Sequence, residues 1–320
     1  MVTKTGDPAQ NQLTRDNVER YTDGFASWAG ILCGLASAVI WGAFPVVTRL
    51  GLTHTALDAY DITFIRYTVS GVILLPFLLR HGLKGLGWQA IALMVFGIGA
   101  PYMLVVAFGL AQAPVEQFAV VTPGSMILFS VLISVWSFDV PLLRKEKAGI
   151  ALIVAGVALV GYHSFASSQA SPSAYLIFLL GGLLWAVYTV SSKRFSTSAL
   201  HATAIVSVFS LAGYLPLYLA VRGAHLLQAP SWDIGVQAVY QGVLVSIVAL
   251  FFYSKSVQLL GPAIGATFAA LVPGGATVLA MLTLGEKAST TAIIGLVTVT
   301  AGMALALLRQ RRRTSPSSAH

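Results

Sequence analysis

The sequence predicts an all-α integral membrane protein in which ten transmembrane helices form two inverted five-helix repeats. The first observation is composition: 57% of the residues are hydrophobic, only 9% are charged, and the mean hydropathy is +0.81. A soluble domain carries about 25% charged residues, so a soluble fold is excluded. The second observation is a series of ten long apolar runs, and the third is a similarity between the two halves of the chain.

Each apolar run is long enough to cross a hydrocarbon layer of about 30 Å as a helix. Helices are the only open-chain structure that can do so, because unpaired backbone groups find no water in lipid. Glycine, proline or charged residues mark several ends, as at 80–82, 113–114 and 139–141. The predicted spans are 29–50, 59–80, 88–111, 115–138, 146–163, 174–193, 201–222, 232–258, 263–284 and 287–308.

The basic residues predict the orientation of these spans. With both termini in the cytosol, only Arg49, Arg222 and Lys287 of the 19 Lys and Arg residues fall on the opposite side, and Arg66 and Lys255 fall inside spans. The remaining 14 lie in cytosolic segments, as the positive-inside rule requires. Membrane topology thus explains the net charge of +8, and we expect no nucleic-acid partner.

The two ends of the chain are polar. The first stretch has mixed charge and no signal-peptide pattern, so we expect a disordered tail, and the last stretch is rich in arginine. Cys33 is the single cysteine, which excludes a disulfide framework. The predicted organisation is a cytosolic tail at 1–28, a first repeat at 29–163, an extracytoplasmic linker at 164–173, a second repeat at 174–308 and a basic cytosolic tail at 309–320.

Matched motifs define the two repeats. Residues 40–49 of the first span correspond to residues 184–193 of the sixth, with matched tryptophans and matched bases. The Pro-Gly pairs at 123–124 and 273–274 interrupt the fourth and ninth spans at equivalent depth. Because each repeat has an odd number of spans, the second copy must be inverted. Two inverted halves can exchange conformations around a site at the midplane, which is a structural basis of alternating access.

Aromatic side chains near the middle of the spans are candidates for the wall of a transport path. Two matched tryptophans lie at central depth, although tryptophan in bilayers prefers the interfaces. A lined cavity would give each indole N–H a partner, and packing alone is the alternative interpretation. The aromatic candidates are Trp41, Phe44, Tyr102, Trp185, Tyr188 and Tyr253.

Pro123 and Pro273 are candidates for the same path. Each removes one hydrogen bond inside its helix and frees a carbonyl. At a repeat interface, the partner of that carbonyl can be substrate, ion or water. A kink required only for packing is the alternative.

Three charged side chains fall within or near the spans. A charge at mid-membrane costs about 2.5–3.5 kcal/mol on the insertion scale, so Arg66 should be paired or face water. Either Asp61 or Asp58 pairs with it as an interfacial anchor, or it contacts an anionic substrate group. Lys255 either snorkels to the interface or binds an anion in the cavity. Glu116 is a candidate coupling acid for protons.

The sequence lacks the residue patterns of metal binding, histidine proton relays and ATP hydrolysis. The sequence has no histidine relay at mid-membrane, no clustered metal ligands and no phosphate-binding loop of the ATPase type. We therefore expect no metal, no cofactor and no catalytic residues.

Several motifs carry a resemblance to a known family. They are Leu260-Gly261-Pro262-Ala263, Ala270-Leu271-Val272-Pro273 and Leu284-Gly285-Glu286 in the second half, with Phe64-Ile65-Arg66-Tyr67 and Val121-Thr122-Pro123 in the first. Over residues 29–308 the chain resembles the drug/metabolite transporter superfamily, in particular its EamA-type branch. The resemblance implies ten helices, cytosolic termini and secondary transport of small metabolites, often export. The chain departs from the family at Asp139-Val140, where Gly-Glu usually ends the fourth span, and at Lys255.

We therefore expect a secondary transporter of the bacterial inner membrane that moves small organic metabolites, such as amino acids or other amphipathic or anionic compounds, by alternating access. Export is favoured by the resemblance alone. The expected partners are the substrate, membrane lipid and a coupled proton or counter-substrate, with the protein a monomer or homodimer. A polytopic enzyme or flippase acting on lipid-linked substrates is the alternative, as is a receptor or scaffold that binds without flux.

Overall fold

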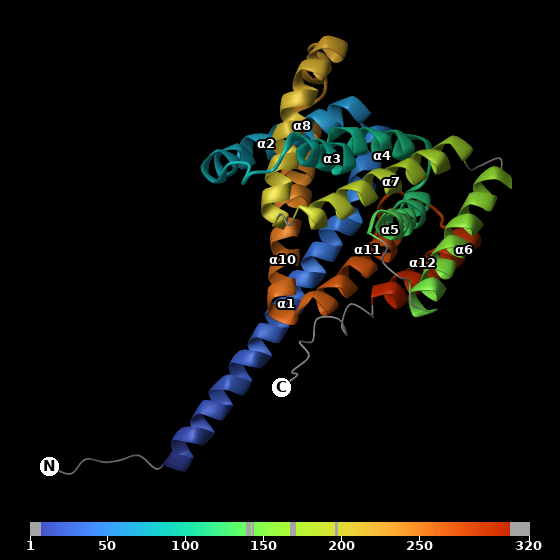
Figure 1. Cartoon of the computed structure of the whole chain (residues 1–320). Coiled ribbons are helices and arrows are strands. Elements are labelled where there is room, and N and C mark those ends of the chain that lie inside the picture. Colours follow the sequence, from blue (N-terminus) through green and yellow to red (C-terminus); the bar gives the residue numbers. More distant parts are fainter. Residues whose placement is uncertain (1–7, 139–141, 143, 167–170, 196–197, 308–320) are drawn as a thin grey trace.

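The computed structural model describes the chain except for residues 1–7, 139–141, 143, 167–170, 196–197 and 308–320. Asp139, residues 167–170 of the predicted linker and the basic C-terminal tail lie outside the described residues. Within them the fold is all-helical and has no strand (Figure 1). The helices are α1 Pro8–His54, α2 Ala59–His81, α3 Trp88–Ile98, α4 Ala100–Gln112, α5 Val115–Phe138, α6 Arg144–Ala166, α7 Pro172–Arg194, α8 Ala199–Arg222, the 3₁₀ turn η1 His225–Gln228, α9 Ser231–Gln237, the π-helix η2 Ala238–Val248, α10 Ala249–Leu260, α11 Pro262–Thr283 and α12 Thr290–Leu307.

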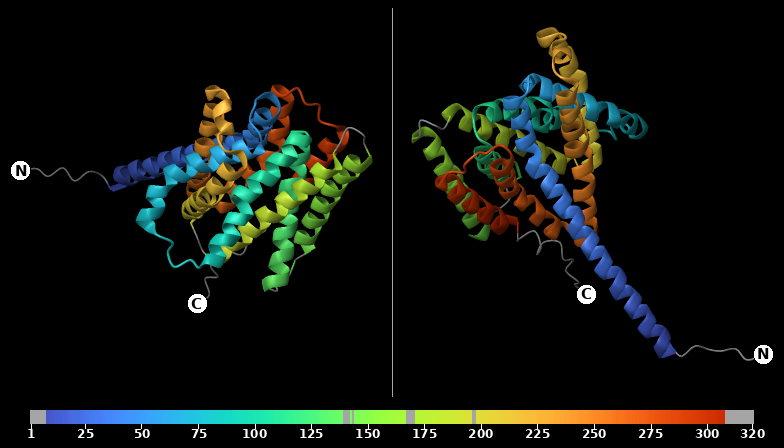
Figure 2. Two further views of the ribbon diagram at one scale, coloured as in Figure 1. Left: turned by 90° about the horizontal axis from the view of Figure 1, so that it is seen from above. Right: turned by 180° about the vertical axis from the view of Figure 1, so that it is seen from behind.

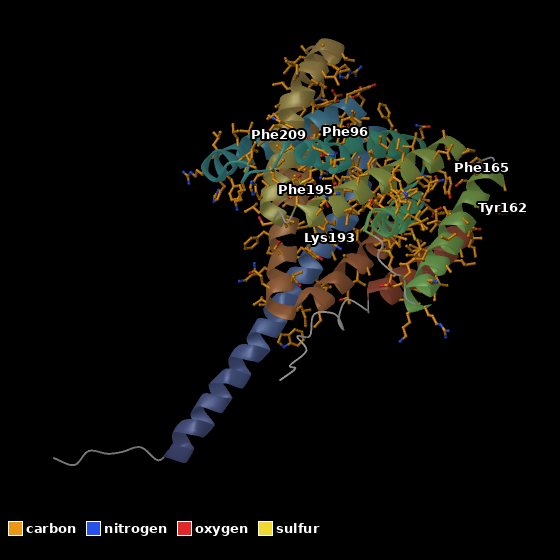
Figure 3. The ribbon with its side chains drawn as sticks, viewed as in Figure 1. Phe96, Tyr162, Phe165, Lys193, Phe195 and Phe209 are labelled. Atoms are coloured by element: carbon orange, nitrogen blue, oxygen red, sulfur yellow. The ribbon has the colours of Figure 1, made fainter. Side chains whose placement is uncertain are left out.

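The described surface is apolar, as expected in lipid. Large hydrophobic side chains are exposed on helix after helix, including Leu79, Trp136 and Leu282. Figure 3 shows Tyr162 and Phe165 at the outer edge of α6, and both are exposed. Eight helical segments have the length and apolarity of membrane spans. α11 and α12 contribute shorter apolar stretches, so the prediction of ten spans is confirmed for eight.

Helix α1 extends far beyond the predicted first span. It begins at Pro8, so the expectation of a disordered N-terminal tail is wrong from Pro8 onward. From Ala9 to Ser27 its sequence holds one glycine and no proline, so little interrupts helical propagation. Figure 2 shows this part of α1 leading away from the rest of the chain.

The third span of each predicted half is irregular. Span 88–111 is divided into α3 and α4 at Gly99, where Ser210 Oγ accepts the Ala100 N–H at 3.1 Å. Pro101 stands at the start of α4 and removes a backbone donor there. Span 232–258 contains the π-helix η2, which ends where Ala249 donates to the Leu244 carbonyl. The repeats therefore share a site of irregular backbone at corresponding positions.

Helix packing follows a paired pattern. α1 packs against α10 and α11, and α7 packs in the corresponding way against α3, α4 and α5. α2 packs on α8, and α6 lies along α12 (Figure 1).

The contact between α6 and α12 depends on glycines. A Cβ at Gly149 would lie 2.9 Å from the Gly302 carbonyl, and one at Gly156 would lie 2.9 Å from the Gly295 carbonyl. Because Gly149 faces Gly302 while Gly156 faces Gly295, the two helices run antiparallel. Small residues allow such close approach in membranes.

Candidate functional site

Four of the predicted aromatic residues form two pairs. The Trp41 ring on α1 lies 5.2 Å from the Tyr253 ring on α10, centroid to centroid. The Trp185 ring on α7 lies 6.1 Å from the Tyr102 ring on α4. Each pair joins the first span of one predicted half to the third span of the other. Trp41 lies at the centre of its 28–54 apolar segment, so the pairs lie deep in the membrane.

The π-helix supplies the partner of one indole. Since Ala249 donates to the Leu244 carbonyl, the Val245 carbonyl is released from the usual α-helical bond. Trp41 Nε1 donates to this carbonyl at 3.3 Å. An indole N–H at central depth thus has the backbone partner that burial requires.

Arg66 lies inside the membrane beside a neutral amide. It stands seven residues into α2, about 10 Å from the helix start. Its Nη1 donates to Gln241 Oε1 at 3.3 Å and lies 4.0 Å from Met103 Sδ. The guanidinium carbon is 5.3 Å from the Phe44 ring centroid, and Nε is buried without a partner. No acid among the described residues pairs with it.

The two acids expected to pair with Arg66 are used elsewhere. Asp58 caps α2 and forms an ion pair with Arg222. Asp61 is fully buried, accepts the Tyr218 hydroxyl at 2.5 Å and lies 3.1 Å from His225 Nδ1. The prediction that Asp58 or Asp61 anchors Arg66 is therefore wrong.

The same cluster holds three potential metal ligands. Ligand atoms of Asp58, Asp61 and His225 lie within 4.8 Å of one another. Arg222 already brings a cation to Asp58, and Asp61 is saturated by donors. The cluster is accounted for as an ion-pair network that fixes α2 against α8.

The remaining predicted residues lie in three kinds of surroundings. Pro123 and Pro273 are buried inside continuous helices. Tyr188 is half-buried where α7 meets α3, so close that a Cβ at Gly97 would lie 2.6 Å from the Tyr188 nitrogen. The side chain of Lys255 is exposed.

Charged residues join the helices at the end of the molecule that is predicted to face outward. Arg49 forms an ion pair with Glu286, and its Nη1 donates to the carbonyls of Leu110 at 2.5 Å and Ala113 at 2.7 Å. The second oxygen of Glu286 accepts the Val115 N–H at 2.9 Å. The end of α1, the α4–α5 connection and the α11–α12 connection are thereby tied together.

Glu116 lines a small cavity at the same end. The cavity has a volume of about 140 Å³ and is lined by residues of α5, α6, the α11–α12 connection and the start of α12, among them Gln117, His163 and Lys287. The Glu116 carboxylate accepts the Ser289 N–H at 3.1 Å. Glu116 is thus half-buried in a polar cavity, away from the aromatic pairs.

Two polar residues at the centre of the site were missed in the sequence. Gln241 and Thr48 are fully buried and connect Arg66 to α1. A signal was present, because Gln237 and Gln241 interrupt a long apolar run four residues apart. Polar residues in membrane helices commonly make interhelical hydrogen bonds.

Comparisons with known proteins agree with this description. The chain is 23% identical over 258 residues to the uncharacterized inner membrane transporter YedA of Escherichia coli strain K12, covering 78% of this chain and 81% of YedA. It is 23% identical over 304 residues to a probable amino-acid metabolite efflux pump of Salmonella typhimurium, covering 88% and 96% of the two chains. A solved crystal structure superposes with a TM-score of 0.56 at 23% identity, covering 89% of this chain and 99% of its own, which supports the fold alone.

The family comparison covers almost all of the apolar chain. The model of the EamA-like transporter family matches residues 28–162 and matches again at residues 172–308. Together with the apolar helices, this match and the relatives indicate a multi-pass inner membrane transporter. The chain belongs to the EamA-like transporter family.

Proposed function

We propose that the protein exports small carboxylate-bearing metabolites, with amino acids the leading class, by alternating access of two inverted five-helix repeats. The observation that carries this proposal is Arg66, a cation within the membrane whose hydrogen-bond partner is a neutral amide. An uncompensated charge there is costly, and such residues commonly belong to substrate pathways. A substrate carboxylate is the counter-ion that the described residues do not supply.

The aromatic pairs favour a substrate with an apolar body. Trp41 with Tyr253 and Trp185 with Tyr102 present large ring surfaces at central depth. Binding sites for small molecules are mostly apolar, with a few polar groups that fix orientation. An amphipathic carboxylate matches both features, and the relative named as an amino-acid metabolite efflux pump agrees with it.

Three observations support the inverted repeat. The family model matches twice, at residues 28–162 and 172–308. In the sequence correspondence of the two halves, Gly149 matches Gly295 and Gly156 matches Gly302. The contact Gly149–Gly302 is therefore the symmetry mate of the contact Gly156–Gly295, as a two-fold axis requires. The matched tryptophans Trp41 and Trp185 each pack against a tyrosine from the third span of the other half. Interrupted helices at corresponding positions point to a transport site between such repeats.

The network around Arg49 ties together the helix ends on one side of the molecule, which suits a conformation in which the transport path is closed on that side. That end faces outward if both termini are cytosolic, as the positive-inside rule predicts. Alternating access then requires the Arg49–Glu286 network to open before substrate leaves on that side. Coupling to protons at Glu116 or exchange for a counter-substrate would drive the cycle.

Counterflow in proteoliposomes tests the function. Vesicles loaded with unlabelled L-phenylalanine should accumulate labelled L-phenylalanine and labelled 3-phenylpropionate, but not 2-phenylethylamine. Arg66→Gln should raise the apparent KM for both carboxylates by about tenfold or more, because a charged hydrogen bond contributes about 1.5–3 kcal/mol. Arg80→Gln, an exposed arginine near the end of the same helix, is the control and should have no effect. Unchanged carboxylate transport by Arg66→Gln would overturn the proposal. A wild-type protein that exchanges none of the carboxylates in a broader panel of metabolites would overturn it as well.

A further inference from the structure

We infer that Gln241 determines specificity for carboxylates by holding Arg66 in position without neutralising its charge. The inference rests on the proposed function and adds a positioning residue from the second half of the chain. Gln241 is 0% exposed and lies on η2, whereas Arg66 lies on α2. The contact therefore joins the two predicted repeats at the proposed site.

A chain of hydrogen bonds fixes the orientation of the Gln241 amide. Thr48 Oγ1 donates its proton to the Phe44 carbonyl at 2.7 Å, so it can only accept from a second partner. Gln241 Nε2 donates to that oxygen at 2.9 Å. Since Nε2 faces Thr48, Oε1 must face Arg66, where it accepts from Nη1 at 3.3 Å.

The hold on Arg66 is weak enough to be exchanged. A distance of 3.3 Å exceeds the common value of about 2.9–3.0 Å for such bonds. Arg66 Nε is buried without a partner, so the edge of the guanidinium that contains Nε lacks one of its bonds. A carboxylate can bind a guanidinium with two parallel hydrogen bonds, which are about twice as strong as neutral ones.

The backbone of the π-helix brings Gln241 to this place. A Cβ at Gly242 would collide with Val69, so glycine allows η2 to approach α2 closely. Ser246 Oγ donates to the Gln241 carbonyl at 2.8 Å, five residues back, which matches the π spacing. The position of the amide is thus set by the irregular backbone that the third span of each half shares.

A glutamate at position 241 tests the role of neutrality. It has nearly the shape of glutamine, but it would supply Arg66 with an internal carboxylate. Gln241→Glu in nanodiscs gains an ion pair with Arg66 but loses the bond to Thr48 Oγ1, whose hydroxyl must turn to donate to the new carboxylate, so the melting temperature should stay near that of wild type. Its dissociation constant for 3-phenylpropionate should rise by about tenfold or more, because the internal ion pair competes with the ligand.

Gln237 offers a matched control on the same face of the helix. Its Nε2 donates to the Val47 carbonyl of α1 at 2.9 Å, whereas the Nη1 of Arg66 bonds to Gln241. Gln237→Met, which adds no buried charge, should leave the dissociation constant for 3-phenylpropionate within about twofold, a change of less than about 0.5 kcal/mol. Should Gln241→Glu not fold, Gln241→Met is the second test. A rise of about tenfold in its dissociation constant for 3-phenylpropionate supports the inference, because a charged hydrogen bond is lost. An unchanged dissociation constant overturns it.

The outcomes separate this inference from the proposed function. Carboxylate binding that depends on Arg66 but is unchanged in Gln241→Glu would overturn the role of Gln241 alone. Binding that is unaffected by Arg66→Gln would overturn the proposed function and this inference with it.

Discussion

Arg49 and Glu286 form an ion pair that joins the end of α1 to the connection between α11 and α12. Their side chains are only 19% and 15% exposed, and each makes further bonds to the backbone. Arg49 donates to the carbonyls of Leu110 and Ala113, and Glu286 accepts the Val115 N–H. The pair therefore organises the α4–α5 connection as well as its own two segments.

Removing one partner of this pair should destabilise the closed end more than removing both. Arg49→Leu leaves two carbonyls and the Glu286 carboxylate unpaired, and breaking a buried pair costs about 3–5 kcal/mol. Glu286→Gln retains one of the two acceptors and should cost about 1.5–3 kcal/mol. The double variant Arg49→Leu with Glu286→Leu should melt above Arg49→Leu in a fluorescence-detected thermal assay. Equal melting temperatures of Arg49→Leu and wild type would contradict the contact.

Closure at this end also predicts chemical accessibility. In a Cys33→Ser background, a cysteine at Leu110 or Ala113 should react slowly with a membrane-impermeant maleimide while Arg49 and Glu286 are intact. Glu286→Gln should increase the rate, because the connection is released from one bond. A cysteine at the exposed Leu227 is the control and should react at the same rate in both backgrounds. A rate at Leu110 that does not depend on Glu286 would exclude the pair from gating.

The glycine contact between α6 and α12 predicts a position-dependent effect of a single methyl group. Gly302→Ala would place a Cβ 2.7 Å from the Gly149 carbonyl, and overpacking of this kind costs about 1–3 kcal/mol. Gly213→Ala on α8 has no atom within 4 Å of its new Cβ and should stabilise by about 0.5–1 kcal/mol through helix propensity. Thermal unfolding of the two variants in the same detergent compares them directly. A Gly302→Ala protein as stable as wild type would show that the helices pack more loosely.

The aromatic pairs predict a shared role for both tryptophans. Trp41→Phe retains a ring beside Tyr253 but leaves the Val245 carbonyl without its donor, so it should weaken L-phenylalanine counterflow moderately. Trp41→Ala combined with Trp185→Ala should abolish saturable exchange, because both ring surfaces are lost. Initial rates over a range of substrate concentrations measure the effect. Normal exchange by the double alanine variant would remove both residues from the site.

The helix boundaries could be predicted because membrane thickness sets the length of each run. The span predicted at 59–80 is α2 at 59–81, and that at 115–138 is α5. The prediction for the last span began at residue 287, but α12 begins at Thr290, since the Ser289 hydroxyl caps it by accepting the Ala292 N–H.

The irregular spans could not be predicted from their sequence. Residues 232–258 are mostly apolar, and a π-helix and an α-helix differ too little in residues per turn for their few polar positions to distinguish the two. The partner of Arg66 was missed for a different reason: Asp61 and Asp58 are the acids near it in the sequence, whereas Asp61 binds Tyr218 and His225, which lie more than 150 residues away. Contacts between the two halves depend on tertiary packing, which local sequence spacing does not reveal.

If Glu116 is the coupling acid, its substitution should abolish proton coupling but retain substrate exchange. Its cavity also holds His163 and Lys287, and Glu286 is the next carboxylate along this face. If protons enter there, Glu116→Gln mimics the protonated acid permanently. An imposed pH gradient should then no longer drive net export of L-phenylalanine, whereas counterflow without a gradient should continue at a rate near that of wild type. His163→Gln, in the same cavity, is the control and should keep its response to the gradient. A Glu116→Gln protein that still responds to the gradient would place the coupling acid elsewhere, and a wild type that ignores the gradient would favour exchange for a counter-substrate.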